Sequence, residues 1–400
     1  MIQKRIDKIE INDLLGLVEN GVREGKSIEY KQQLPGGTDA DKKEFLADIS
    51  SFANASGGTV VFGVIEARDS NGKASGVPES IAGLANVNAD AEVRRLEQMI
   101  RDGLEPRIPG IGLMAIDGFP DGPVIVIQIP QSWAAPHMVA FKSSPRFFSR
   151  TSAGKSPLNV PEIRAAFLQS EELPKRIRQF REERLGLIVA GETPVPLPQS
   201  PLSILHLVPV ASFLNPPNVD VLDFLDGRVF LPPMGASGYN SRLNIDGYVS
   251  YQGGKLPDDE QFNYAQIFRN GIVEGVDAFI LSGHDEKDNF IPSIALEEDL
   301  LQGARQYFKA YKAIGISGPV IVMLSLLNVR GFYMHAGNRM MSRTIHRIEK
   351  KNLLLPDVIV EDIETPVESS FRPVFDLVWQ GCGFRRSFNY DDSGQWNPRN

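Results

Sequence analysis

The stretch EFLADISSFANASGGTVVFGVIEARD, residues 44–69, decides the fold of the N-terminal half of the chain. Three apolar residues in it have the spacing of one helical face: Phe45, Ile49 and Phe52. This spacing predicts a helix over residues 41–55, which Gly57 and Gly58 end. The β-branched, apolar run 59–65 then predicts a single buried strand.

Helix and strand signals alternate outward from this stretch. In the N-terminal half, further helices are predicted over 11–20, 91–103 and 160–169, and strands over 27–32, 123–130 and 147–150. In the C-terminal half, strands are predicted over 203–210, 248–251, 264–269 and 319–328, and a helix over 294–314. Both halves therefore favour the α+β fold class, with a mixed α/β arrangement in the first.

A proline-rich stretch, ETPVPLPQSP at residues 192–201, marks the clearest break in the chain. Four prolines in ten residues favour an extended, semi-rigid connector. The predicted organisation is an N-terminal domain of residues 1–190, a linker of residues 191–201 and a C-terminal domain of residues 202–400.

Composition excludes several classes of protein. With 42% apolar and 23% charged residues, the chain is neither disordered nor fibrous. The single cysteine, Cys382, can close no internal disulfide and excludes a zinc site built on several thiolates. No uncharged apolar run reaches the ~18 residues that a membrane helix needs. We therefore expect a cytoplasmic protein without a membrane partner.

The net charge of −8 taken over the whole chain argues against nucleic-acid binding, but the charge is unevenly distributed along the sequence. Residues 1–185 carry 24 basic and 25 acidic side chains, whereas residues 186–400 carry 18 and 25. Residues 142–184 contain ten basic and five acidic side chains. Four of the ten are candidate nucleic-acid contacts: Arg146, Arg150, Lys155 and Arg176. A solvated surface is the alternative interpretation of these residues.

Three carboxylates and one lysine are candidates for a catalytic site. Glu24 and Glu29 flank the start of the strand predicted over 27–32, and Lys31 projects to the same face as Glu29. Glu66 follows the apolar run. If the two strands are neighbours, these groups converge and could bind Mg²⁺ or Mn²⁺, with Lys31 at a phosphate. Taken without further evidence, the same residues are better interpreted as solvated surface charges.

Two Gly-Lys-Ser tripeptides resemble a phosphate-binding loop. That motif needs a glycine five residues before the Gly-Lys pair. Asn20 and Ser149 stand at the two relevant positions, ahead of Gly25 and Gly154. The sequence therefore argues against an ATPase of this type and makes a nucleotide-binding module less favoured.

The order of several motifs over about residues 15–170 resembles the Schlafen-type AlbA-like domain. These are EGKSIEYKQQL, the FANASGG segment with its flanks, the VIVIQIPQS strand exit and RFFSRTSAGKSPLNVPEIRAAF. In that family three acidic residues form an endoribonuclease site, and Glu24, Glu29 and Glu66 match their positions. Ile65-Glu66 stands where the family often has Asp-Asp. Asn54, Gly57 and Gly58 match positions that we expect to be structural.

The resemblance implies a metal-dependent endoribonuclease of the prokaryotic Schlafen-like kind, acting on structured RNA such as tRNA. Glu24, Glu29 and Glu66 would hold Mg²⁺ or Mn²⁺, and the zinc-binding cysteines of vertebrate members are absent. A role in defence against phage would follow from the same resemblance. The alternative is a non-catalytic regulator that binds DNA or RNA through this domain. For the C-terminal half, which resembles no family, specificity or homo-oligomerisation is the expected role.

Overall fold

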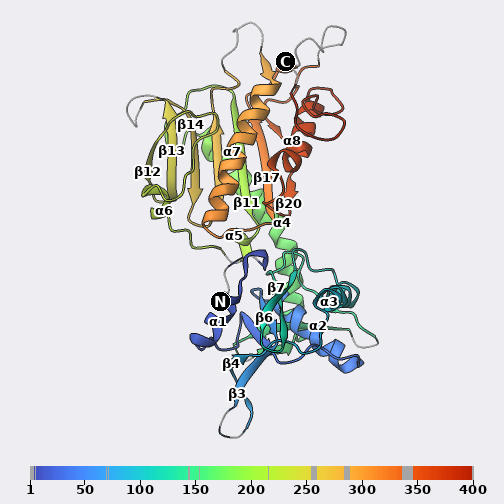
Figure 1. Cartoon of the computed structure of the whole chain (residues 1–400). Coiled ribbons are helices and arrows are strands. Elements are labelled where there is room, and N and C mark those ends of the chain that lie inside the picture. The colour runs from blue at the N-terminus through green and yellow to red at the C-terminus, as the bar shows by residue number, and fades with distance from the viewer. Residues whose placement is uncertain are drawn as a thin grey trace. The chain divides into compact units, whose positions relative to one another are not determined.

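The computed structural model describes residues 4–398 except 5, 69, 71, 143, 144, 153, 215, 254–258, 283–288 and 336–345. The chain forms two compact units, residues 1–175 and residues 176–400 (Figure 1). Each unit mixes helices with sheets, which confirms the predicted α+β class. None of the described helices is long and apolar enough to cross a membrane.

A four-stranded sheet forms the centre of the first unit. Its strands lie in the order β1 (Ile28–Lys31), β2 (Gly58–Phe62), β7 (Gly122–Ile129) and β6 (Gly112–Phe119). Strand β1 runs parallel to β2, and α2 (Asp39–Ala53) makes the crossover that parallel strands require. Strand β7 is antiparallel to both of its neighbours. The helix predicted over 41–55 and the strand predicted over 27–32 are thus present as α2 and β1.

Helices cover both faces of this sheet. Figure 1 shows α1 (Ile11–Glu19) on one side, and α2 with α3 (Ala89–Gly103) on the other. The predicted face of α2 packs on β2 and β7 through Phe45, Ile49, Phe52, Val60 and Ile127. Neighbouring strand residues point the other way, so Val61 and Val126 pack beneath Leu14 and Leu17 of α1. Two separate cores therefore hold the central sheet, and Ile28 and Tyr30 of β1 belong to the core under α1.

The strand predicted over 59–65 is broken at Gly63, which corrects the sequence interpretation. Gly63 has a φ of +99°, and a Cβ atom there would lie 2.9 Å from the Cα of Gly83. The chain leaves the central sheet at this point. It continues as β3 (Val64–Arg68), which forms a separate ribbon with β4 (Ala74–Ile81). Glu66 therefore lies on this ribbon rather than at the end of β2.

A second small sheet completes the first unit. Its strands lie in the order β10 (Gly154–Pro157), β9 (Arg146–Thr151), β8 (Met138–Val139) and β5 (Leu104–Glu105), all antiparallel. The segment predicted as a short strand at 147–150 is thus the centre of β9. A 3₁₀ turn, η1 (Ile6–Lys8), precedes α1.

The helix predicted over 160–169 is far longer than its pattern indicates. Helix α4 runs over Val160–Val189 and contains Pro174, and the division between the two units falls within it. The last turns of α4 carry Leu185 and Ile188, which share a core with Val195 and Leu197 of the proline-rich stretch. That stretch therefore packs as part of the second unit.

The second unit is built on a sheet of eight strands. Along it lie β12 (Asn240–Leu243), β13 (Gly247–Gly253), β14 (Gln261–Phe268), β15 (Val273–Asp277), β11 (Leu202–Pro209), β17 (Val320–Leu327) and β19 (Leu353–Leu354), and β20 (Val358–Val360) also pairs with β17. Two further strands pair with each other, β16 (Phe290–Pro292) and β18 (Tyr333–His335). Its helices are α5 (Ala211–Leu214), α6 (Leu222–Leu225), α7 (Ser293–Ala313) and α8 (Val367–Gly381).

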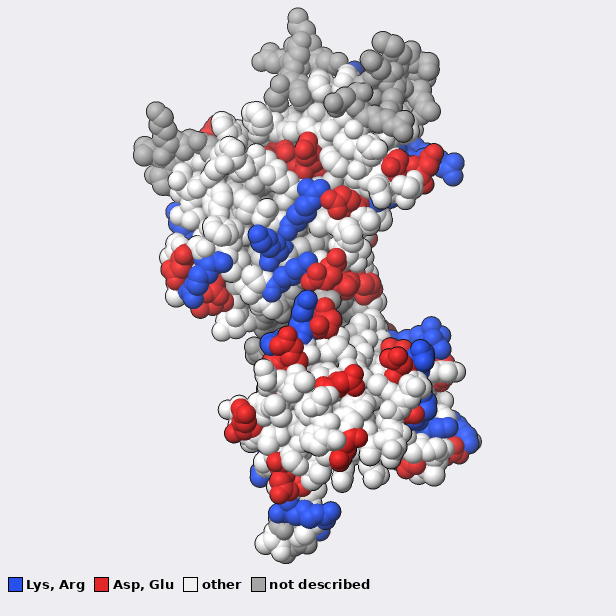
Figure 2. All heavy atoms as spheres, viewed as in Figure 1, with Lys and Arg blue, Asp and Glu red and all other residues white. Residues whose placement is uncertain are grey.

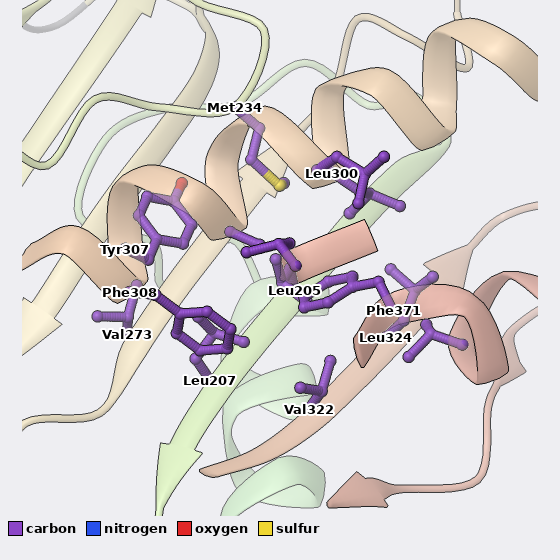
Figure 3. Close-up of a cluster of buried hydrophobic side chains, with 14 of the residues drawn as sticks. Leu205, Leu207, Met234, Val273, Leu300, Tyr307, Phe308, Val322, Leu324 and Phe371 are labelled. Atoms are coloured by element: carbon purple, nitrogen blue, oxygen red, sulfur yellow. The ribbon is translucent and has the colours of Figure 1, made fainter. Parts of the chain in front are cut away.

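Helices α7 and α8 bury one face of this sheet. Figure 3 shows Leu300 and Phe308 of α7 and Phe371 of α8 against the side chains of the strands. Leu205 of β11 and Leu324 of β17 lie directly opposite each other in register and belong to the same core. Sequence reasoning anticipated α7, β11 and β17, but it missed α8 and β15.

The opposite face of the same sheet holds a fully buried carboxylate, Glu274 of β15. Its oxygens accept hydrogen bonds from Arg184 at 2.8 and 2.9 Å, from the His206 ring at 2.8 Å and from the Tyr264 hydroxyl at 2.9 Å. Burial alone would raise the pKa of Glu274, but Arg184 and His206 outweigh it and lower the pKa to about 2. The ion pair between Arg184 and Glu274 thus connects the last turns of α4 to the sheet.

Replacing Gly57 by alanine should destabilise the first unit strongly. Gly57 has a φ of +73°, and its Cβ atom would lie 2.7 Å from the Gln131 nitrogen and 2.8 Å from the Ile129 oxygen. We expect the free energy of unfolding to fall by about 2 kcal/mol or more, measured by urea denaturation. Gly37→Ala is the control, because nothing lies within 4 Å of its Cβ position. Equal unfolding midpoints for the two variants would contradict the constraint at Gly57.

Replacing Glu274 by glutamine should destabilise the second unit, because Arg184 would keep a buried charge without a counterion. Breaking such a pair from one side costs about 3–5 kcal/mol. The exposed pair of Asp226 and Arg228 provides the matched control, and Asp226→Asn should cost less than about 1 kcal/mol. Thermal unfolding of both variants distinguishes them, and a change in Glu274→Gln as small as the control's would refute the stabilising role of the pair.

Candidate functional site at the edge of β1

A tight turn before β1 folds Glu24 back onto the strand. The Gly25 N–H donates to the Ile28 oxygen at 3.1 Å, which closes the turn. Glu24 Oε1 then accepts the backbone N–H of Tyr30 at 2.6 Å, and the Glu24 N–H donates to the Gly76 oxygen at 2.7 Å. The carboxylate is therefore held at the outer edge of β1, against β4.

Glu66 reaches the same place from β3. Its Oε2 atom accepts the backbone N–H of Gly76 at 3.0 Å. Gly76 has a φ of +71°, and its missing Cβ atom would lie 3.6 Å from Glu24 Oε2. Glu24 and Glu66 thus share one glycine, which has no side chain to separate them. The sequence analysis expected Glu24 and Glu66 to converge, but it placed Glu66 just after the buried strand rather than within β3.

The environment of Glu24 favours its protonated form. Burial is the main cause, and the nearby charges of Glu29 and Glu66 add to it, so the pKa of Glu24 rises from 4.5 to about 7. The hydrogen bond from Tyr30 acts in the opposite direction but is outweighed. A carboxyl group that titrates near neutral pH beside a second carboxylate is a frequent property of catalytic and cation-binding sites.

Glu29 has a different environment, because two cations neutralise it. Glu29 and Lys31 project from the same face of β1, and Lys31 Nζ lies 2.6 Å from Glu29 Oε1. Arg150 of β9 donates to Glu29 Oε2. Burial would raise the pKa of Glu29, but Lys31 and Arg150 outweigh it and lower it. Both carboxylate oxygens of Glu29 are therefore engaged in ion pairs.

Asp48 of α2 is a member of this network that sequence reasoning missed. Its carboxylate accepts a hydrogen bond from Lys155 at 2.8 Å, and Lys31 Nζ lies 3.7 Å away on the other oxygen. Burial raises the pKa of Asp48, opposed by both lysines. A signal was present in the sequence, because an aspartate within the buried stretch of a helix requires a cationic partner. Asp48 links α2 to β1 and β10 through these lysines.

The four basic residues expected to contact nucleic acid do not form one surface. Only 3% of the Arg150 side chain is exposed, and its guanidinium donates to the Gly25 oxygen and lies 4.2 Å from the Phe52 ring centroid. This burial corrects the assignment of Arg150 as a phosphate contact. Lys155 is held by Glu44 and Asp48. Arg146 is exposed. Arg176 belongs to the second unit, where it donates to the Phe213 oxygen.

The three residues expected to be structural occupy positions that fit that role. The Asn54 side chain donates to the backbone oxygens of His137 and Phe148 at 2.9 and 2.8 Å and accepts the His137 N–H at 2.6 Å. It thereby joins the end of α2 to β8 and β9. At Gly58 a Cβ atom would lie 2.3 Å from the Phe52 ring. Like Gly57, this position leaves no room for a side chain.

The site residues fit a divalent cation in part. Among the residues that the structure describes, no three His, Cys, Asp or Glu side chains are grouped closely enough to hold a metal ion. Glu29 lacks a free oxygen, which sets it apart from the other two acids. In the described part of the chain, Glu24 Oε2 and Glu66 Oε1 accept no hydrogen bond. Two carboxylates suffice for Mg²⁺, which usually keeps water and phosphate oxygens as its other ligands.

Comparisons with known proteins address the N-terminal unit. The family model described as Schlafen, AlbA_2 matches residues 24–159, a range that contains all three glutamates. A solution NMR structure of the N-terminal domain of a putative ATP-dependent DNA helicase RecG-related protein from Nitrosomonas europaea is 22% identical, with a TM-score of 0.23. The match covers 31% of this chain and 74% of that one. No curated protein matches the chain.

The raised pKa of Glu24 predicts a pH dependence of stability. In the unfolded chain Glu24 has its ordinary value of 4.5, whereas in the folded protein it holds its proton up to about pH 7. The folded state therefore binds more protons in this window, and stability should fall as the pH rises from 4.5 to about 7. Urea midpoints measured across this range without metal should fall less in Glu24→Gln than in the wild type. Identical pH profiles would contradict the assignment.

Proposed function

We propose, from the premise that residues 24–159 form a Schlafen AlbA_2 domain, that this protein binds nucleic acid and cleaves structured RNA such as tRNA. The observation that carries the proposal is the pair of Glu24 and Glu66 around Gly76, with one oxygen of each facing no donor among the described residues. Cleavage of RNA in defence against phage is the biological setting that we infer for it.

We assign Glu24 and Glu66 as the residues that would hold Mg²⁺ or Mn²⁺. Their oxygens are the hard donors that these ions prefer. A bound ion of this kind stabilises the charge that develops on a phosphate during cleavage and acidifies an attacking water or hydroxyl. It would also offset the charges of Glu29 and Glu66, which add to burial in raising the pKa of Glu24.

Lys31 is the residue that we assign to the phosphate of the RNA. About a third of its side chain is exposed, 35%, whereas Glu29 and Asp48 beside it are almost buried. Both acids attract its ammonium group and raise its pKa despite burial, so Lys31 stays charged. Glu29 then acts as a positioning residue, because Arg150 fixes it and it in turn fixes Lys31.

A non-catalytic nucleic-acid-binding regulator is the second candidate function. The observation that favours it is the double pairing of Glu29, which leaves two carboxylates rather than three for a metal. A nucleotide-binding module has less support, because Lys155, of the second Gly-Lys-Ser tripeptide, is held by Glu44 and Asp48.

An RNA cleavage assay separates these functions. Purified protein is incubated with total tRNA and Mn²⁺, Mg²⁺ or a chelator, beside Glu24→Gln, Glu66→Gln and Glu29→Gln. We expect Glu24→Gln and Glu66→Gln to lose about a hundredfold in cleavage rate, because each removes an anionic ligand of the ion. Glu29→Gln should also lose activity, because Lys31 is then no longer positioned. Glu79→Gln is the matched control, since Glu79 is exposed on the same β3–β4 ribbon.

Two results would change the assignment. Cleavage by Glu24→Gln at the wild-type rate would show that the reaction occurs elsewhere. If the wild type binds tRNA but leaves it intact with every metal, the regulator is the correct function. Loss of cleavage in Glu79→Gln as well would point to general damage of the ribbon rather than to the chemistry of the site.

A further inference from the structure

A groove of about 410 Å³ lies between α2 and α3 in the first unit, outside the candidate site. Its lining includes Lys42 of α2, Arg95, Gln98 and Met99 of α3, and Phe141 after β8. None of these residues belongs to the network around Glu29. The groove is large enough for a small ligand or for one residue of a polymer.

The floor of the groove is apolar and rigid. Phe141 and Met99 are half-buried and pack against the core that α2 and α3 share with the central sheet. The ammonium of Lys142 lies 5.8 Å from the Phe141 ring centroid and is paired with Asp39. A flat aromatic side chain fixed by a core is suited to stacking against a planar ring.

The rim of the groove is polar. Arg95 is fixed there by Glu92 at 2.7 Å and by the Pro35 oxygen at 3.0 Å. Among the described residues, the Lys42 ammonium forms no ion pair, although its charge acts on nearby Asp39, and the Gln98 side chain is exposed in the groove lining. A free amide can recognise the edge of a base, and a free ammonium can neutralise a phosphate.

A second hollow of about 520 Å³ adjoins the groove at Asp102. Its lining adds Arg101 and Arg107, both exposed. Together the two linings contain four cations, Lys42, Arg95, Arg101 and Arg107, against two carboxylates, Asp102 and Glu105. Figure 2 shows Lys and Arg side chains interspersed with Asp and Glu side chains on the side of the first unit where α2 and α3 lie. Arg101 pairs with Asp102 at 3.7 Å and Arg95 with Glu92 at 2.7 Å, so among the described lining residues Lys42 and Arg107 are the cations outside ion pairs, and these two favour an anionic ligand.

We propose that this groove binds one unpaired nucleotide of a nucleic-acid strand. The base stacks on Phe141 and Met99, Gln98 contacts its edge, and Lys42 and Arg107 receive the phosphates on either side. An acidic peptide would use the cations but not the flat aromatic floor. This inference rests on the proposed function, because it assigns a strand-binding surface to the same unit.

Helix α2 connects the groove to the candidate site. Lys42 precedes Asp48 by six residues on this helix. The rise of an α-helix places their backbones about 9 Å apart along its axis. With 3.6 residues per turn, the two side chains also lie about 120° apart around the helix axis, so a strand held in the groove reaches Lys31 by passing around α2. Single-stranded segments of a structured RNA are then the part that the protein recognises.

The test measures binding without cleavage. Fluorescence anisotropy in the presence of a chelator compares a labelled single-stranded RNA 12-mer with a duplex of the same sequence. Phe141→Leu should weaken single-strand binding about tenfold, because leucine keeps apolar volume but cannot stack. Phe141→Trp should retain binding and shows that the position tolerates substitution. Lys42→Ala should reduce the slope of binding against salt by about one phosphate contact, whereas the neighbouring Lys43→Ala should not.

The outcomes separate this inference from the proposed function. If wild-type protein binds the single strand and both Phe141→Leu and Lys42→Ala bind it equally well, the groove assignment is wrong and the catalytic proposal stands. Equal affinity of the wild type for the duplex and the single strand would also overturn it. If Phe141→Leu weakens binding while Glu24→Gln still cleaves, the catalytic site fails and the groove remains. A wild type that binds neither RNA refutes both.

Discussion

The buried ion pair between Arg150 and Glu29 is the interaction on which the N-terminal unit depends. It joins side chains 121 residues apart in the sequence, one on β9 and one on β1. The same guanidinium donates to the Gly25 oxygen in the turn that positions Glu24, and it lies over Phe52 of α2. A buried pair of this kind is stable only when further hydrogen bonds satisfy both groups. Here Arg150 donates to Glu29 and to the Gly25 oxygen, and its remaining nitrogen, Nη1, lies 3.9 Å from Asp48 Oδ1 without a hydrogen bond.

The local pattern of the sequence predicted much of the fold around this pair. The spacing of Phe45, Ile49 and Phe52 identified α2 and the face that it buries, because that spacing reflects packing on a neighbouring sheet. The break at Gly63 was not predictable in the same way. An apolar run has the same appearance whether it is one strand or two, and only the close approach to Gly83 requires the glycine. The length of α4 was missed because its later turns pack within the second unit.

The candidate site was predictable to a smaller extent. The sequence brought Glu24, Glu29 and Glu66 together by their spacing around two strands, and the structure does place Glu24 beside Glu66. It could not assign partners, because the pairing of Glu29 with Arg150 and of Asp48 with Lys155 depends on contacts more than a hundred residues apart. Arg150 and Lys155, which look like part of a surface patch in the sequence, are thus counterions of Glu29 and Asp48. Whole-chain net charge carries correspondingly little information about binding.

The hydrogen bond from Tyr30 to Glu24 has a consequence for the assembly of the sheet. Strand β1 is the last strand of its sheet, and such edges offer unpaired N–H groups to which strands of other molecules can add. The Tyr30 N–H of β1 donates to the Glu24 carboxylate, so an incoming strand would find a side chain there instead of a free donor. Glu24, which we assign to metal binding, therefore also hinders the addition of a strand from another molecule at this edge. Selection on this glutamate can act through solubility as well as through activity.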